Sequence, residues 1–195
     1  MEDRQPRALL TEALARFDRP PTSADARRAI DLGCGDGTET LALLQHGWTV
    51  LAIDSEPAAI ARVRSKVPAE YESRLETRVA SFGGLDLPPA DLVYAGFSLP
   101  FCPPAAFDRL WSNIAASLRP GARFAGQLFG NRDSWFGSPG MTFHTSEQVA
   151  GLLIHAFEVE SLQEDENDRP AFSGPKHWHV FHILARSTGA SATRT

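Results

Sequence analysis

Short apolar runs alternate along the chain with stretches whose apolar residues recur at helical spacing. The runs predict strands at residues 28–32, 49–53, 75–81, 91–96 and 123–129. The stretches between them predict helices at residues 6–17, 38–46, 57–67, 107–118 and 145–156. Strands that alternate with helices in this way indicate an α/β domain around a mostly parallel sheet.

The C-terminal part of the chain departs from this alternation. Residues 157–162 and 177–185 predict two successive strands, and an acidic stretch at 164–168 followed by a Gly-Pro pair lies between them. We therefore expect an antiparallel strand pair joined by a long loop. Residues 131–144 show no clear period and predict a second long loop.

Breakers and caps mark the ends of several predicted elements. Residues 18–25 are rich in proline and separate the first helix from the first strand. Gly47 fits the position after a helix end, where a left-handed backbone is needed. Ser55 is expected to cap the helix whose first turn contains Pro57, and Thr145 or Ser146 is expected to cap the last helix.

Neither an internal repeat nor an interior linker interrupts the sequence of 195 residues. Residues 1–186 are therefore expected to form a single domain, a common size for one hydrophobic core. The polar residues 187–195 are expected to form a disordered tail. Oligomeric state leaves no signature in the sequence.

Composition and charge narrow the function classes. The net charge of −5 gives no general basic surface for a phosphate backbone, so we expect no nucleic acid partner. No apolar run approaches the roughly 20 residues that cross a bilayer, and the polar N-terminus does not look like a secretory signal. Cys34 and Cys102 form no disulfide framework, so a reduced cytoplasmic protein is expected, without membrane contact.

The strongest chemical signal is a glycine-rich loop. Asp31-Leu-Gly33-Cys-Gly35-Asp-Gly37 follows the first predicted strand and precedes a helix. Glycines let the backbone turn sharply and let a ligand approach it, and the helix start directs its free N–H groups there. Asp54 ends the second strand, where a carboxylate can accept two hydrogen bonds from a ribose diol. These residues predict a nucleoside-cofactor site.

Two other nucleotide sites are disfavoured by details of this loop. A dinucleotide-binding loop would place glycine or alanine at position 38, where the chain has Thr38. A phosphate-binding Walker loop would need a Gly-Lys-Ser/Thr sequence, and this loop contains no lysine. A cationic cofactor without phosphate suits the acidic Asp31 and Asp36 better.

The segment Ala29-Ile-Asp-Leu-Gly-Cys-Gly-Asp-Gly-Thr38 resembles motif I of class I methyltransferases, and Val50-Leu-Ala-Ile-Asp54 resembles the motif that follows it. The order of elements from residue 6 to 186 is similar to that family, above all to small bacterial enzymes of the tellurite-resistance and thiopurine type. The resemblance implies a Rossmann-like, doubly wound, seven-stranded sheet that is mostly parallel with an antiparallel final strand. It also implies methyl transfer from S-adenosylmethionine.

The resemblance assigns cofactor contacts along four loops. The family often has an acidic residue after the third strand, where this chain has Ser81 and Phe82; a hydrogen bond from Ser81 and stacking by Phe82 are expected to replace it. Ala95 and Gly96 are expected to pass close to the cofactor through their backbone. The full set of expected cofactor-binding residues is Asp31, Gly33, Cys34, Gly35, Gly37, Asp54, Ser55, Ser81, Phe82, Ala95 and Gly96.

The acceptor side is less well defined. Ligands bind outside the carboxyl ends of parallel strands, so residues 94–102, residues 131–144 and the N-terminal helix are the expected surroundings of the acceptor. Cys102 is interpreted as a small buried residue rather than a nucleophile. His177 and His179 share one face of a strand while His182 faces the other, so no metal site is assigned. No catalytic residue is assigned either.

Three functions remain open at this point. The first is methylation of a small-molecule acceptor, such as a thiol, a metalloid oxyanion or a similar nucleophile, by in-line displacement. The second is a nicotinamide-dependent oxidoreductase built on the same strand-helix-strand unit. The third is a cofactor-binding protein without turnover, because a fold does not fix a function.

Overall fold

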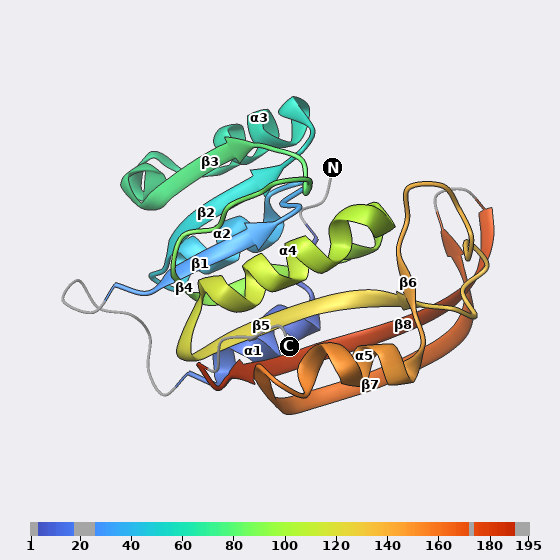
Figure 1. Cartoon of the computed structure of the whole chain (residues 1–195). Helices are drawn as coiled ribbons and strands as arrows, with labels where there is room; N and C mark the ends of the chain where they lie inside the picture. Colours follow the sequence, from blue (N-terminus) through green and yellow to red (C-terminus); the bar gives the residue numbers. More distant parts are fainter. Residues whose placement is uncertain (1–3, 18–25, 172–173, 190–195) are drawn as a thin grey trace.

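The computed structural model describes residues 4–17, 26–171 and 174–189. A single twisted sheet crosses the molecule in the strand order β3-β2-β1-β4-β5-β8-β7, with the two-residue strand β6 beside β5 (Figure 1). The strands are β1 (Arg28–Leu32), β2 (Thr49–Asp54), β3 (Leu75–Val79), β4 (Ala90–Ala95), β5 (Leu118–Gly130), β6 (Phe143–His144), β7 (Phe157–Ala171) and β8 (Gly174–Ser187).

The strand directions confirm the predicted fold class. Strands β1 to β6 pair in parallel, whereas β8 runs antiparallel to both β5 and β7. Seven strands form the continuous path, and β6 adds an eighth strand that the sequence did not predict. The sheet is therefore doubly wound and mostly parallel, with an antiparallel C-terminal edge.

Helices cover both faces of the sheet (Figure 1). The helices α1 (Ala8–Ala15), α2 (Thr38–Gln45) and α3 (Pro57–Lys66) pack on one face, and α4 (Pro104–Ser117) and α5 (Ser146–Leu153) pack on the other. Two short 3-10 turns, Ala69–Arg74 and Leu99–Phe101, complete the described elements. Because both faces are covered, the central strands β1, β2 and β4 are apolar and almost fully buried.

The predicted long loop between the last two strands is wrong. The acidic stretch belongs to β7, which pairs with β8 as far as Ala171 and Gly174. The charged side chains of this extension find cross-strand partners: His177 contacts Glu166 and Asp168, at 3.1 and 2.8 Å. Cross-strand pairs of opposite charge stabilise a strand that has little apolar surface to bury.

Other local predictions are confirmed or corrected. Gly47 has φ 88°, as expected after α2, and Thr145 caps α5 with a full capping box. Ser55 is not the cap of α3, because Glu56 occupies that position and Asp54 accepts its backbone N–H. The buried Ser187 still belongs to β8, one residue beyond the expected end of the domain.

The Pro-rich breaker at 18–25 and residues 190–195 of the expected tail lie outside the described residues. Within the described parts of the chain, none of the helices has the length and apolar character needed to cross a membrane.

Candidate cofactor site

The glycine loop makes its turn where β1 ends. Gly33 and Gly37 have φ 76° and 77°, a left-handed conformation that residues with a side chain rarely adopt. A Cβ on Gly33 would also collide with the Cβ of Ser98, whose hydroxyl donates to the Leu32 carbonyl at 2.5 Å. Glycine at position 33 therefore lets the loop lie directly against the segment that follows β4.

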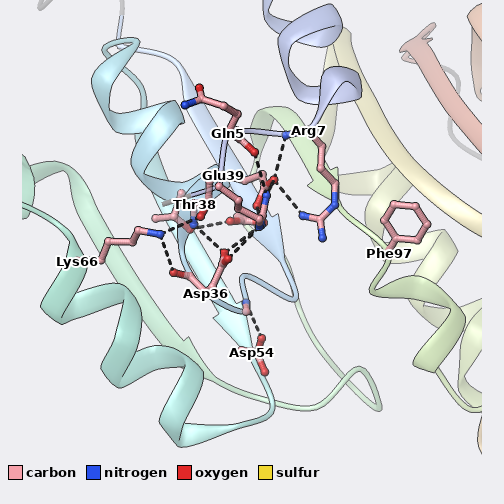
Figure 2. A network of polar contacts seen from close by, with 12 residues as sticks. Gln5, Arg7, Asp36, Thr38, Glu39, Asp54, Lys66 and Phe97 are labelled. Atoms are coloured by element: carbon pink, nitrogen blue, oxygen red, sulfur yellow. Dashed lines mark hydrogen bonds and ion pairs between the residues drawn. The ribbon is translucent and has the colours of Figure 1, made fainter. Parts of the chain in front are cut away.

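Asp54 joins the glycine loop to the end of β2. Its Oδ2 accepts the Gly35 N–H at 2.9 Å, and its Oδ1 accepts the Glu56 N–H at 3.0 Å. An ionised carboxylate has about four acceptor sites, so capacity remains for a ligand. The two backbone N–H groups orient the carboxylate at the carboxyl edge of the sheet, where Figure 2 shows Asp54.

A cavity of about 580 Å³ opens beside this carboxylate. Six of the expected cofactor-binding residues line it, namely Gly33, Asp54, Ser55, Ser81, Phe82 and Gly96. The remaining lining residues are Ala80, Gly83, Phe97, Ser98, Phe101, Pro103 and Ala106, so Asp54 is the single charged side chain among the described lining residues. The segments after β1, β2, β3 and β4 thus meet at one cavity, as the topology of a parallel sheet requires.

The other expected site residues lie behind this surface and do not line the cavity. Cys34 and Ala95 are buried, and burial raises the pKa of the Cys34 thiol. Gly35 uses its N–H to hold Asp54, and Gly37 begins α2 close to the side chain of Val63. These residues support the glycine loop from the side that faces away from the cavity.

Asp31 is likewise buried, with 2% of its surface exposed. The hydroxyl of Thr40 donates to its Oδ2 at 2.6 Å. Burial raises the pKa of Asp31 to about 7, because removal from water disfavours the charged form more than the Thr40 hydrogen bond favours it. Asp31 is therefore poised to ionise near neutral pH.

The segment before α1 lies over the start of α2, a contact that the sequence does not predict. The Arg4 guanidinium bridges Asp36 and Glu39, with Nε to Asp36 Oδ2 at 2.9 Å and Nη1 to Glu39 Oε1 at 2.6 Å. Arg7 adds a second ion pair to Glu39 at 3.0 Å and lies over the Phe97 ring, 5.5 Å from its centroid (Figure 2).

Burial by itself would raise the pKa of Glu39, but the hydrogen bond from Arg4 and the charges of Arg7 and Arg4 outweigh it and lower that pKa. The ion pairs therefore hold Glu39 ionised although only 3% of it is exposed. The sequence does place Asp36 just before the predicted helix, Glu39 in its first turn, and two arginines near the N-terminus.

Phe97 is the second feature that the sequence did not reveal. It follows β4 with φ 58°, the one positive value among the described non-glycine residues. Its N–H donates to Oε1 of the buried Gln127 at 3.1 Å. A left-handed non-glycine residue at a ligand-facing edge is strained, and such strain concentrates at functional sites.

The remaining candidates do not line the 580 Å³ cofactor cavity. Cys102 is fully buried, and burial raises its pKa to about 11, so it is a thiol rather than a nucleophilic thiolate. All three histidines contact acidic residues of β7, and His182 also contacts Gln127. The described residues contain no group of three or more histidine, cysteine, aspartate and glutamate side chains arranged to hold a metal.

Comparisons with known proteins show which proteins this chain is similar to. Residues 29–121 match the family model described as "Methyltransferase domain". The chain is 34% identical over 125 residues to a trans-aconitate 2-methyltransferase of Variovorax paradoxus, covering 63% of this chain and 44% of that protein. It is 34% identical over 100 residues to an uncharacterised methyltransferase of a Synechocystis strain, covering 51% and 45%. The chain spans less than half the length of these two relatives.

A solved structure extends the likeness to almost the whole chain. The crystal structure of TehB from Haemophilus influenzae superposes with a TM-score of 0.77 over 93% of this chain and 62% of that one, at 14% identity. At this identity the superposition shows a shared fold. Residues 29–121, just under half of the chain, are therefore similar to a methyltransferase domain. The matched region contains the glycine loop and Asp54, and β5 to β8 complete the sheet.

Proposed function

We propose that this methyltransferase transfers a methyl group from S-adenosylmethionine to a small-molecule acceptor. The observation that carries the proposal is the cavity at the carboxyl ends of β1 to β4, with the glycine loop on one side and Asp54 beside it. The cavity lies where ligands of open parallel sheets bind. Its volume of about 580 Å³ lies within the ordinary range of small-molecule sites, about 300–1,000 Å³.

The charge of the lining supports a cofactor without phosphate. The described lining contains Asp54 and neither lysine nor arginine, which suits a cationic ligand better than a dinucleotide. We assign the ribose hydroxyls to the Asp54 carboxylate and the adenine to Ser81 and Phe82. We assign the reacting end to the backbone at Gly96, beside Phe97.

When bound, S-adenosylmethionine supplies a methyl group that its sulfonium already activates. The lone pair of the acceptor forms the new bond to the methyl carbon while the carbon–sulfur bond breaks and its electron pair returns to sulfur. The protein therefore has to align the two ligands and exclude water. A protonated acceptor also has to release its proton to a base or to water.

Isothermal titration with S-adenosylhomocysteine tests the cofactor assignment. We expect binding by the parent chain and a loss of at least about tenfold in Asp54→Ala, because the ribose loses a charge-assisted partner. Asp86→Ala, an exposed acid with the same change of charge, is the matched control. The proposal is wrong if the parent chain fails to bind at millimolar ligand, or if a nicotinamide cofactor binds in its place.

Turnover requires a second assay with a panel of acceptors. Thiols and metalloid oxyanions belong in the panel, as does trans-aconitate, which is named as the substrate of one relative. Cofactor binding without methylation of any acceptor would favour a binding protein.

We further propose that residues 28–187 form one domain, since one continuous sheet joins them. We also propose that the two buried free cysteines reflect a reducing cytoplasm.

A further inference from the structure

A second cavity, of about 270 Å³, lies on the extension of the β7–β8 hairpin that the sequence did not predict. Its lining includes Asp165 and Asn167 from β7, and Trp178, Val180 and His182 from β8. Phe97 is the one residue that lines both this hairpin cavity and the cofactor cavity. A ligand on the hairpin would therefore lie next to the reacting end of the cofactor site.

The strand register explains why these side chains converge. Asp165 pairs with Val180 and Asn167 pairs with Trp178, and directly paired residues of antiparallel strands share a face. The alternate residues Glu164 and Glu166 point to the opposite face, where they contact Arg132, His179 and His177. The polar groups of the hairpin cavity are thus separate from the surface ion-pair network.

Gln127 fixes the hydrogen-bonding character of His182. Because the Phe97 N–H donates to Gln127 Oε1, the amide Nε2 faces His182 Nδ1, at 3.3 Å. Nδ1 therefore accepts a hydrogen bond, and the proton of the neutral ring is on Nε2. Burial lowers the pKa of His182, which favours this neutral form.

The cavity consequently offers a donor and an acceptor side by side. His182 Nε2–H points toward Asp165 Oδ2 across 3.4 Å, a separation longer than a good hydrogen bond. Both groups can therefore be engaged by a ligand. The nearby Arg169 is a weaker candidate, because its Nε already donates to Asn167 Oδ1 at 2.6 Å.

The walls of the cavity favour a flat ligand. The Phe97 and Trp178 rings meet edge to face, with centroids 6.3 Å apart and planes at 79°. A planar ring stacked on one of them presents its edge to the other, an arrangement that aromatic rings prefer. The volume of about 270 Å³ lies just below the ordinary range of small-molecule sites, which suits a compact ring system.

We propose that the hairpin cavity binds the methyl acceptor, and that this acceptor is a planar heteroaromatic lactam. Its ring N–H donates to Asp165, its adjacent carbonyl accepts from His182 Nε2–H, and its opposite edge faces Phe97. This assignment rests on the proposed methyl transfer. It favours a neutral heterocycle over a metalloid oxyanion or a carboxylate, which the Asp165 charge would repel.

The test is isothermal titration of the full chain, saturated with S-adenosylhomocysteine, using quinazolin-4(3H)-one as the probe. We expect binding by the parent chain and an affinity at least about tenfold lower in Asp165→Ala, which removes the partner of the ring N–H. Asp168→Ala, an exposed acid on the opposite face of the same strand, is the matched control and should bind as the parent does. The 3-methyl derivative lacks the N–H. It should therefore bind weakly to the parent chain, and Asp165→Ala should bind it with the same affinity as the parent.

Three outcomes would overturn the inference. The first is cofactor binding without binding of the probe, which would leave the proposed function standing. The second is equal affinity of Asp165→Ala and the parent for the probe. The third is saturable binding of trans-aconitate or tellurite that Arg169→Gln abolishes and Asp165→Ala does not. If S-adenosylhomocysteine itself fails to bind, the proposed function falls and this inference falls with it.

Discussion

Lys176 and Asp133 form an ion pair that is sealed from solvent, with 1% and 0% of the two side chains exposed. The Lys176 Nζ also lies 4.0 Å from the centroid of the Trp135 ring and 4.3 Å from that of Trp178. Asp133 accepts two backbone N–H groups in addition, from Trp135 and from His179. The connection after β5 is thus fixed onto the β7–β8 hairpin, and Trp135 lines neither the cofactor cavity nor the hairpin cavity.

Removing one member of this pair should destabilise the fold strongly. Asp133→Ala leaves the Lys176 ammonium buried without its counter-ion, which typically lowers the free energy of unfolding by about 3–5 kcal/mol. Urea denaturation of the purified chain measures the change. Adding Lys176→Met to Asp133→Ala should restore part of the loss, because the unpaired charge is then gone. A loss no larger than that of Arg132→Met, which breaks an exposed pair, would contradict this account.

Local sequence patterns were sufficient to predict the helices and strands around the cofactor cavity. Gly47 ends a helix and the glycine loop turns between β1 and α2 because glycine tolerates a left-handed backbone, a property of the residue itself. The sequence did not predict the extension of β7, because acidic residues without partners are poor strand formers. Their pairing with Arg132 and His177 depends on tertiary contacts.

The difference between local patterns and tertiary contacts also separates the site residues that the sequence predicted from those that it did not. Asp54 and Gly96 lie at strand ends, so the topology of a parallel sheet places them at the cavity. Phe97 and the Arg4–Glu39 pair were not predictable, because a left-handed phenylalanine and a contact over 35 residues leave no local pattern. Asp31 and Cys34 occur in the matched motif, but their side chains turn inward, which motif position alone does not reveal.

His144 should make the fold less stable in mild acid. Burial lowers its pKa to about 4, from an ordinary value of about 6.5, and its Nδ1 has no hydrogen-bond partner among the described residues. Between these values the unfolded chain binds the proton and the native chain does not, so stability falls as the pH falls through this window. We expect His144 to contribute about 2 kcal/mol to the decrease in the free energy of unfolding between pH 7 and pH 5. Urea denaturation at both pH values should show a smaller loss in His144→Leu, and an equal loss would contradict the assignment.

Asp31 should make cofactor binding depend on pH near neutrality. Its pKa of about 7 means that the carboxyl is largely protonated below this pH. Asp31 does not line the cavity, so we expect its charge to act on the cationic amino-acid end of the ligand through space, and binding then releases a proton below pH 7. The affinity should therefore rise with pH by up to about tenfold per unit until it levels off near pH 7. Titrations of S-adenosylhomocysteine from pH 5.5 to 8 measure this rise. Asp31→Asn should flatten the profile, and an equally steep profile in that variant would rule out this role.

Tyr94 is the neighbour of Asp31 on the next strand. The two residues are paired in register between β1 and β4, so their side chains share a face of the sheet. The Tyr94 hydroxyl is buried and has no hydrogen-bond partner in the described structure. A Cβ built on Gly96 would lie 2.9 Å from this oxygen, so the hydroxyl lies against the backbone that borders the cofactor cavity.

Tyr94→Phe should therefore change stability and cofactor binding in opposite directions. In the free protein the substitution removes an unsatisfied buried hydroxyl, so the free energy of unfolding should rise by about 1 kcal/mol. Burial raises the pKa of Tyr94, which keeps the hydroxyl protonated, and we expect it to donate to the carboxylate of the bound amino-acid end. The affinity for S-adenosylhomocysteine should fall about tenfold. The affinity for 5′-methylthioadenosine, which lacks the amino-acid end, should stay the same. A less stable variant with unchanged affinity for both ligands would instead make Tyr94 a packing residue.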